Sequence, residues 1–278
     1  MTHPDSSDAT SRETFPSGSF ATADSLTRTE NPDLVRQCDI KGVLHTHTRV
    51  DDGFHSLSAM VETAREIGLE YLGVSDHYRC STSRNGMDSD GMKRQRDEIE
   101  DLMEKYPGFD ILQGVELDVC SNGSLPLDEK ILDTFDYVIV SLDGSLEEDA
   151  VAQTERALRI IQNPLTKIIS KPLGNLMLRR PPVPLDIEAV LAAAAETRTA
   201  VEIDAHPSSF ELDWFHCHLA QELGVLLSIN PNAHRAARLV DYRHGVELAR
   251  RAGICCSSIL NTMTSQKLRD YFNTHTDR

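Results

Sequence analysis

Short apolar runs that alternate with longer amphipathic stretches constrain the fold of this chain more than any other feature. Runs of this length, flanked by turn residues, are typical of strands buried in a parallel sheet. The stretches between them have the period of helices, so the alternation predicts repeated βα units. With 278 residues, the chain has the length of a single α/β barrel and a tail. The runs occupy residues 39–44, 71–75, 110–117, 137–142, 167–170, 200–203 and 225–229.

The helical stretches have clear apolar faces. Residues 56–69 (SLSAMVETAREIGL) place Leu57, Met60, Val61, Ala64 and Ile67 on one side. Residues 186–196 and 215–224 repeat this pattern, and Gly224 is positioned to end the second of them. The charged stretch 93–105 (KRQRDEIEDLMEK) is more typical of a solvent-facing helix with internal ion pairs than of a binding strip.

The first 37 residues differ in composition from the rest of the chain. They are rich in Ser, Thr, Asp, Pro and Ala, and they contain few large apolar side chains. Such a segment buries too little surface to offset its ordering entropy, so we predict a disordered tail over 1–37 and one domain over 38–278. We find neither a secretory signal nor an apolar run of membrane-spanning length, and we therefore expect a cytoplasmic protein without membrane partners.

Charge and cysteine content exclude some classes of function. The 28 Lys and Arg against 44 Asp and Glu give a net charge of −16, which disfavours broad binding to nucleic-acid backbones. The six cysteines contain no CxxC pair, and reduced thiols are the simplest interpretation. The adjacent Cys255 and Cys256 are interpreted as ordinary packing residues rather than as a redox or metal site.

Polar side chains follow each of the predicted strands. Because barrel enzymes build their sites at the carboxyl ends of the strands, these residues are the first candidates for function. Histidine occurs at four of the ends, which favours a metal or acid–base site. The residues are His45 and His47, Asp76 and His77, Glu116 and Asp118, Asp143, Lys171, Asp204 and His206, and Asn230, Asn232 and His234.

The sharpest local motif is LHTHT at residues 44–48. In an extended segment His45 and His47 point to the same side, so both imidazoles can reach one cation. A lone His-x-His is weak evidence, but here Asp51 and Asp52 follow it, and the next strand ends in SDH. We interpret the motif as part of a metal site.

These motifs resemble the PHP (polymerase and histidinol phosphatase) superfamily, and in particular the C-terminal PHP domain of bacterial and archaeal X-family DNA polymerases. The resemblance extends over residues 39–272 and leaves no room for a polymerase segment in this chain. It implies a distorted seven-stranded (βα) TIM-like barrel that holds up to three divalent cations. It is carried by KGVLHTHTRVDDGFHSL, GLEYLGVSDHY, LQGVELDV, FDYVIVSLDGS, NPLTKIISKPLGNLMLRRP, AVEIDAHP, LGVLLSINPNAH and LNTMTSQKL.

The resemblance also implies a set of metal ligands. Positions that match the family in residue type are His45, His47, Asp52, His77, Glu116 and His234. Three ligand positions depart from it: Asp143 and Lys171 stand where the family usually has His, and Asn232 where it has Asp. Asn175 and Asp204 are further departures, from the usual Arg and Asn. Asp143 and Asn232 still offer oxygen ligands, and we keep both in the predicted metal set.

Lys171 cannot be an ordinary ligand, because an ammonium has no lone pair and repels a cation. We hypothesise that an ion pair between Asp143 and Lys171 replaces one metal, with carboxylate and ammonium within about 4 Å of each other. His77, His234 and Asp52 would then hold one ion, and His45, His47 and Glu116 a second that Asn232 weakens. We expect one or two ions, Zn or Mn, and not three. The alternative is that these histidines are only polar filling at the barrel mouth.

Two function hypotheses follow. The first is a divergent metal-dependent phosphoesterase with reduced or altered activity on phosphate monoesters or 3′ nucleic-acid ends. Its catalytic residues would be His45, His47, Glu116 and Lys171, and Arg179 and Arg180 would bind the phosphate. The second is a non-catalytic PHP protein that binds a phosphorylated ligand or a protein partner. The remaining histidines, which we interpret as surface or capping residues, are His206, His216, His218 and His244.

Overall fold

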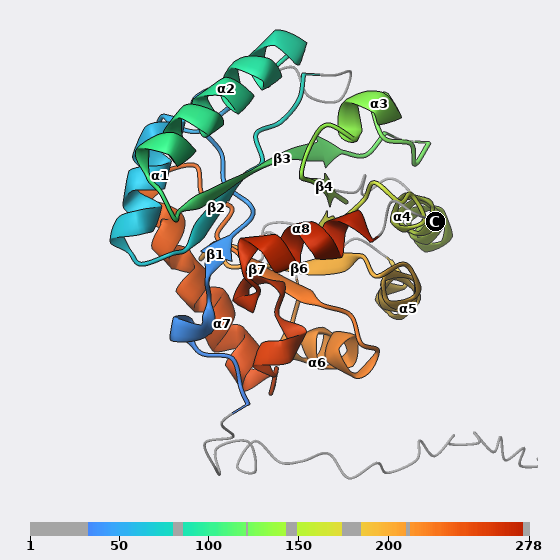
Figure 1. Cartoon of the computed structure of the whole chain (residues 1–278). Coiled ribbons are helices and arrows are strands. Elements are labelled where there is room, and N and C mark those ends of the chain that lie inside the picture. Colours follow the sequence, from blue (N-terminus) through green and yellow to red (C-terminus); the bar gives the residue numbers. More distant parts are fainter. Residues whose placement is uncertain are drawn as a thin grey trace, which may run out of the picture. The chain divides into compact units, whose positions relative to one another are not determined.

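The computed structural model describes residues 33–79, 86–120, 122–142, 149–173, 185–209 and 212–274. Its strands form one parallel sheet in sequence order, curved into a nearly closed barrel (Figure 1). This confirms the predicted seven-stranded barrel. The strands are β1 Gly42–Val43, β2 Tyr71–Val74, β3 Asp110–Asp118, β4 Tyr137–Ser141, β5 Ile168–Ser170, β6 Ala200–Asp204 and β7 Leu227–Asn230.

Helices cover the outside of the barrel (Figure 1). Most begin at a Ser, Thr or Asp whose side chain accepts a hydrogen bond from a backbone N–H of the first turn, as Ser56 and Asp186 do. The predicted apolar face of the first helix is buried through Leu57, Met60 and Val61. The helices are α1 Leu57–Glu66, α2 Ser89–Lys105, α3 Glu129–Leu132, α4 Ala150–Ile161, α5 Ile187–Thr197, α6 Trp214–Glu222, α7 Tyr242–Arg251 and α8 Ser265–Asn273.

Two apolar cores hold these layers together. The larger one lies between the sheet and the surrounding helices. The smaller one includes Tyr71 and Tyr137 at the starts of their strands, together with Leu268 and Phe272 of α8. The rings of Tyr137 and Phe272 stack with centroids 5.7 Å apart. Helix α8 therefore packs against the amino ends of the strands, and the polar site is built at the opposite ends.

An asparagine joins the first and last strands. Asn261 donates from Nδ2 to the carbonyl oxygens of Gly42 (3.0 Å) and Ile229 (2.9 Å), and its Oδ1 accepts from the Ile229 N–H at 2.6 Å. Further along, the His47 N–H donates to the Ala233 carbonyl at 3.0 Å. The side-chain amide thus satisfies backbone groups that a regular β1–β7 ladder would otherwise pair.

The packed body begins before residue 38. Val35 is fully buried, and Leu34 forms a β-bridge with Cys255. Residues 33–37, assigned to the tail by the sequence prediction, therefore contact the barrel, while 1–32 lie outside the described residues. The described cysteines are free thiols. Among the helices described, none combines the length and hydropathy that a bilayer span requires.

Candidate metal centre

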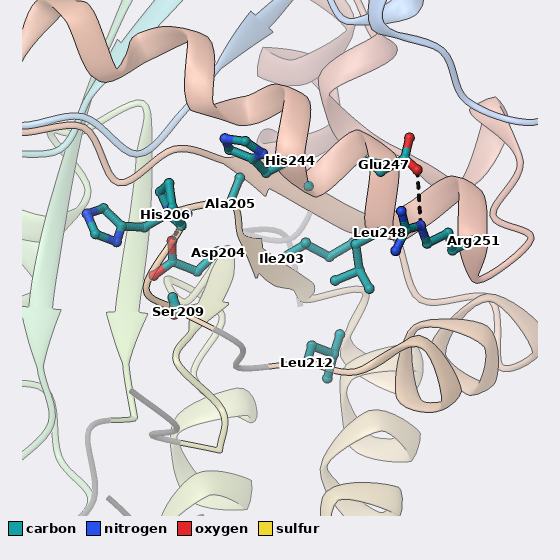
Figure 2. Close-up of a pocket in the computed structure, with 12 residues that line it drawn as sticks. Ile203, Asp204, Ala205, His206, Ser209, Leu212, His244, Glu247, Leu248 and Arg251 are labelled. Atoms are coloured by element: carbon teal, nitrogen blue, oxygen red, sulfur yellow. Dashed lines mark hydrogen bonds and ion pairs between the residues drawn. The ribbon is translucent and has the colours of Figure 1, made fainter. Parts of the chain in front are cut away.

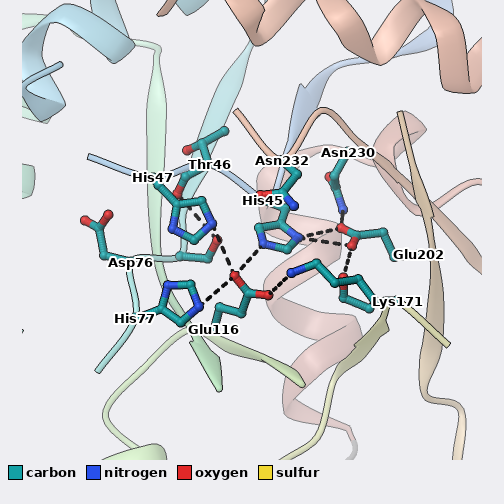
Figure 3. Close-up of polar contacts among 12 residues, drawn as sticks. His45, Thr46, His47, Asp76, His77, Glu116, Lys171, Glu202, Asn230 and Asn232 are labelled. Atoms are coloured by element: carbon teal, nitrogen blue, oxygen red, sulfur yellow. Dashed lines mark hydrogen bonds and ion pairs between the residues drawn. The ribbon is translucent and has the colours of Figure 1, made fainter. Parts of the chain in front are cut away.

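The carboxylate of Glu116, on β3, is the centre of the site (Figure 3). Its Oε2 lies 2.9 Å from Nε2 of His45, 3.2 Å from Nε2 of His47 and 3.3 Å from Nε2 of His77. Its Oε1 accepts a hydrogen bond from Lys171 Nζ at 3.1 Å. Glu116 is buried. The structure thus brings together His45, His47 and Glu116, the three residues that the sequence analysis assigned to one ion.

A second buried carboxylate, Glu202 of β6, holds His45 from the other side (Figure 3). Its two oxygens lie 2.9 and 3.0 Å from His45 Nδ1. It also accepts hydrogen bonds from Asn230 Nδ2 at 2.8 Å and from the hydroxyl of Ser170. Burial opposes a charge on the His45 ring, but Glu202 and Glu116 outweigh it and raise its pKa to about 10.

Sequence reasoning missed Glu202. The available signal was its position, since it is an acidic residue in the middle of the buried strand AVEID. A carboxylate in such a strand needs partners, because burying an unpaired charge is costly. By accepting from Nδ1 it leaves Nε2 of His45 directed at Glu116, which is how outer carboxylates orient metal-binding histidines.

The loop after the His-x-His motif supplies two carboxylates with different partners. Asp51 Oδ2 lies 2.7 Å from His77 Nδ1 and 3.2 Å from His47 Nδ1, and these contacts outweigh burial and lower its pKa. Asp52 instead lies 3.1 Å from Nε2 of His234. Asp52 therefore lies near both other members of the predicted trio, His77 and His234, while Asp51, which the sequence prediction left out of the ligand set, directly contacts His77.

Two groups of possible ligands share one residue: His45, His47 and Glu116 form the first, and His47, Asp51, Asp52 and His77 form the second. The ring of the shared residue, His47, stacks on that of His234 with centroids 4.3 Å apart. Burial opposes a positive charge on His47, but contacts with Asp51 and Glu116 raise its pKa to about 9. The ligand atoms in each group lie within 4.8 Å of one another.

Two buried polar atoms at this site lack hydrogen-bond partners among the described residues. One is His47 Nε2, which is close to Glu116 but not aligned for a hydrogen bond, and the other is Asn232 Oδ1. An imidazole nitrogen that gives up its proton and an amide oxygen are both able to bind a cation. The donor set therefore fits one or more divalent metal ions.

Lys171 lies inside the site and pairs with Glu116. Burial opposes its charge, but Glu116 raises the pKa of the ammonium above its ordinary value. Lys171 and Asn232 both have a left-handed backbone, with φ of 50° and 46°, a conformation that costs on the order of 1 kcal/mol outside glycine. The predicted partner Asp143 lies outside the described residues, as do Asn175 and the predicted phosphate-binding pair Arg179 and Arg180.

The other histidines lie apart from these groups. His216 Nδ1 is 2.9 Å from Asp213 at the start of α6, and His218 Nε2 is 3.4 Å from Glu222, as expected for surface and capping residues. His206 and His244 line a cavity of about 280 Å³ between the end of β6 and α7 (Figure 2).

The sequence is similar to two kinds of curated protein. A DNA polymerase/3′-5′ exonuclease of Bacillus subtilis is 33% identical over 84% of this chain. The match covers only 41% of the length of that protein. A probable phosphatase of Thermoanaerobacter sp. is 32% identical over 84% of this chain and 95% of its own length. A probable phosphatase of Caldanaerobacter subterraneus is 30% identical over 82% of this chain and 90% of its own length. No protein-family model matches the chain.

Solved structures support the fold. The histidinol phosphate phosphatase of Lactococcus lactis, crystallised with zinc, L-histidinol and phosphate, has a TM-score of 0.57 to this structure at 16% identity. The alignment covers 77% of this chain and 94% of that one. A candidate histidinol phosphatase of Listeria monocytogenes has a TM-score of 0.56 at 13% identity, over 72% of this chain and 97% of that one. Together with the sequence relatives and the barrel, these likenesses show that the chain belongs to the PHP superfamily.

Proposed function

We propose that this protein is a metal-dependent phosphoesterase that hydrolyses phosphate monoesters. The observation that carries the proposal is the Glu116 carboxylate, buried among the Nε2 atoms of His45, His47 and His77. Such a set of nitrogen and oxygen donors suits zinc or manganese. The relatives of similar length are probable phosphatases, which supports the same reaction class.

We assign the metal ligands to two adjoining groups. His45, His47 and Glu116 would hold one ion, and His47, His77 and the carboxylates of Asp51 and Asp52 would hold another. Asn232 and His234 lie at the edge of these groups and are proposed as weaker contributors. When bound, the cation lowers the pKa of a water molecule and neutralises charge on the phosphoryl oxygens.

The protein's own residues position this chemistry. Glu202 fixes the orientation of His45, and Asp51 does the same for His77. The Lys171 ammonium would attract a phosphoryl oxygen, since it carries its charge into the site without needing a bound ion. Arg179 and Arg180 stay predicted phosphate contacts.

The substrate class is proposed more broadly than a single compound. A phosphorylated small molecule is favoured because the net charge of −16 opposes association with a long nucleic-acid backbone. Hydrolysis at a 3′ nucleic-acid end stays the alternative substrate, suggested by the polymerase/exonuclease relative. A cytoplasmic location stays a prediction from the sequence.

Metal content and hydrolysis test the proposal together. Protein purified without chelator should contain bound zinc or manganese, and it should hydrolyse p-nitrophenyl phosphate when Mn²⁺ or Zn²⁺ is added. The His77→Ala variant should lower metal affinity at least about tenfold and reduce hydrolysis at least as much, because it removes an imidazole whose Nε2 faces Glu116 and whose Nδ1 faces Asp51. Isothermal titration with Mn²⁺ and a colorimetric assay measure the two effects.

His218→Ala is the matched control, because His218 is exposed on α6 and lies outside both ligand groups. It should bind metal and hydrolyse the ester as the wild type does. Metal binding without turnover of p-nitrophenyl phosphate or a short DNA substrate would contradict the phosphoesterase assignment. That result would favour the non-catalytic hypothesis, which the Lys171–Glu116 ion pair at a ligand carboxylate also supports.

The role of Lys171 gives opposite expectations for binding and turnover. In Lys171→Met the repulsion between the ammonium and a nearby cation disappears, so we expect metal affinity to rise by at least about tenfold. We also expect kcat to fall, because the charge proposed to attract the phosphoryl oxygen is lost. Metal titration and steady-state kinetics on the same preparation check both results. Unchanged metal affinity would contradict the placement of Lys171 beside the ion.

A further inference from the structure

An exposed aromatic side chain lies at the edge of the metal centre. Phe54 is 61% exposed, so much of its ring is accessible to a ligand. The guanidinium carbon of Arg235 lies 3.5 Å above the centroid of the Phe54 ring. The guanidinium group thus covers one face of the ring, and we call Phe54 and Arg235 the stacking rim.

The stacking rim is tied to the site by the backbone. The Phe54 N–H donates to the His234 carbonyl at 2.8 Å, and the Ala236 N–H donates to His55 Nδ1 at 3.4 Å. Phe54 follows Asp52 by two residues and Arg235 follows His234 directly, and Asp52 and His234 themselves lie 3.1 Å apart. These backbone hydrogen bonds therefore hold the Phe54 ring next to predicted ligands, although the ring is not buried in the core.

Two exposed arginines lie in the segments that carry the predicted ligands. Arg235 and Arg49 are exposed, and within the described part of the chain neither forms an ion pair with a carboxylate. Arg49 lies in the segment that carries His47 and Asp51, and Arg235 directly follows His234. They would attract an anionic ligand towards the metal centre.

We propose that the stacking rim binds a planar aromatic ring in the leaving group of the phosphate ester, such as a nucleobase or a phenyl ring. Aromatic and guanidinium planes hold such rings by stacking, without reading a particular pattern of hydrogen bonds. The inference rests on the proposed phosphoesterase function and narrows its substrate class. It predicts a preference for aromatic over aliphatic esters.

Equilibrium binding of two phosphonates tests the inference without turnover. Benzylphosphonate carries a ring, ethylphosphonate does not, and neither has an ester bond to hydrolyse. On Mn²⁺-loaded protein, benzylphosphonate should bind about tenfold more tightly by isothermal titration. Phe54→Ala should remove that advantage and leave ethylphosphonate affinity within about twofold, whereas Phe54→Tyr should keep it.

Trp214→Ala is the matched control, because Trp214 is an exposed aromatic on α6 and is 56% exposed. It should not change either affinity. Equal affinities for the two phosphonates in the wild type, failure of both to bind, or an equal loss of both in Phe54→Ala would overturn the inference. Hydrolysis of p-nitrophenyl phosphate is scored separately, so the phosphoesterase function can stand when the ring preference fails. The converse result, ring-dependent binding without turnover, would retain the inference and reject the function.

Discussion

Replacing Glu116 with Gln should abolish metal binding at the His45–His47 group and destabilise the metal-free protein by about 3–5 kcal/mol. The carboxylate is buried and shared between Lys171 and the three imidazoles, so its loss leaves a partly buried ammonium with no partner at this contact. A neutral amide cannot balance that charge, although its size is almost the same. Urea unfolding of the chelated protein and metal analysis by mass spectrometry measure the two effects.

The same variant should change how stability depends on pH. In the metal-free wild type the pKa of His45 is raised to about 10 and that of His47 to about 9, from an ordinary value of 6.5. Above pH 6.5 the unfolded chain releases these protons and the folded chain keeps them, so stability should fall as pH rises towards 9 to 10. Glu116→Gln should flatten this dependence.

Glu100→Gln, at an exposed position on α2, is the control for the loss of one negative charge. It should leave the metal content, the free energy of unfolding and its pH dependence unchanged. A Glu116→Gln protein that binds metal normally and unfolds at the wild-type urea concentration would contradict the central position of Glu116.

Asn261→Ala should destabilise the protein by about 3 kcal/mol or more, because it removes the side-chain amide that joins the first and last strands. Asn261 is fully buried, and its amide bonds to the backbone of Gly42 and Ile229. Each backbone group left buried without a partner costs about 1–3 kcal/mol. Thermal and urea unfolding, followed by circular dichroism, measure the loss.

The junction is also connected to the site. Asn261 Nδ2 lies 3.2 Å from Asn230 Oδ1, and Asn230 in turn donates to Glu202, which holds His45. We therefore expect Asn261→Ala to weaken metal binding as well as stability. Asn273→Ala, at the exposed end of α8, is the control and should change neither. A loss below about 1 kcal/mol would show that water or a β1–β7 rearrangement replaces the amide.

Much of the fold was predictable because its signals are local. Each strand is a short apolar run, and the amphipathic stretches 56–69 and 186–196 became helices with buried apolar residues. Local periodicity depends only on neighbouring residues, so it can be read without knowing the tertiary contacts. The junction at Asn261 was not predictable, since its partners Gly42 and Ile229 lie 219 and 32 residues away.

The sequence by itself also indicated where the candidate metal centre lies. Alternation in an extended segment places His45 and His47 on one side, and parallel strands bring their carboxyl ends to one end of the barrel. Only the tertiary structure decided which carboxylate faces which imidazole: Glu202 faces His45, Asp51 faces His77, and Lys171 pairs with Glu116. Those pairings depend on the directions in which separate strands and loops present their side chains, and no local pattern of residues specifies such directions.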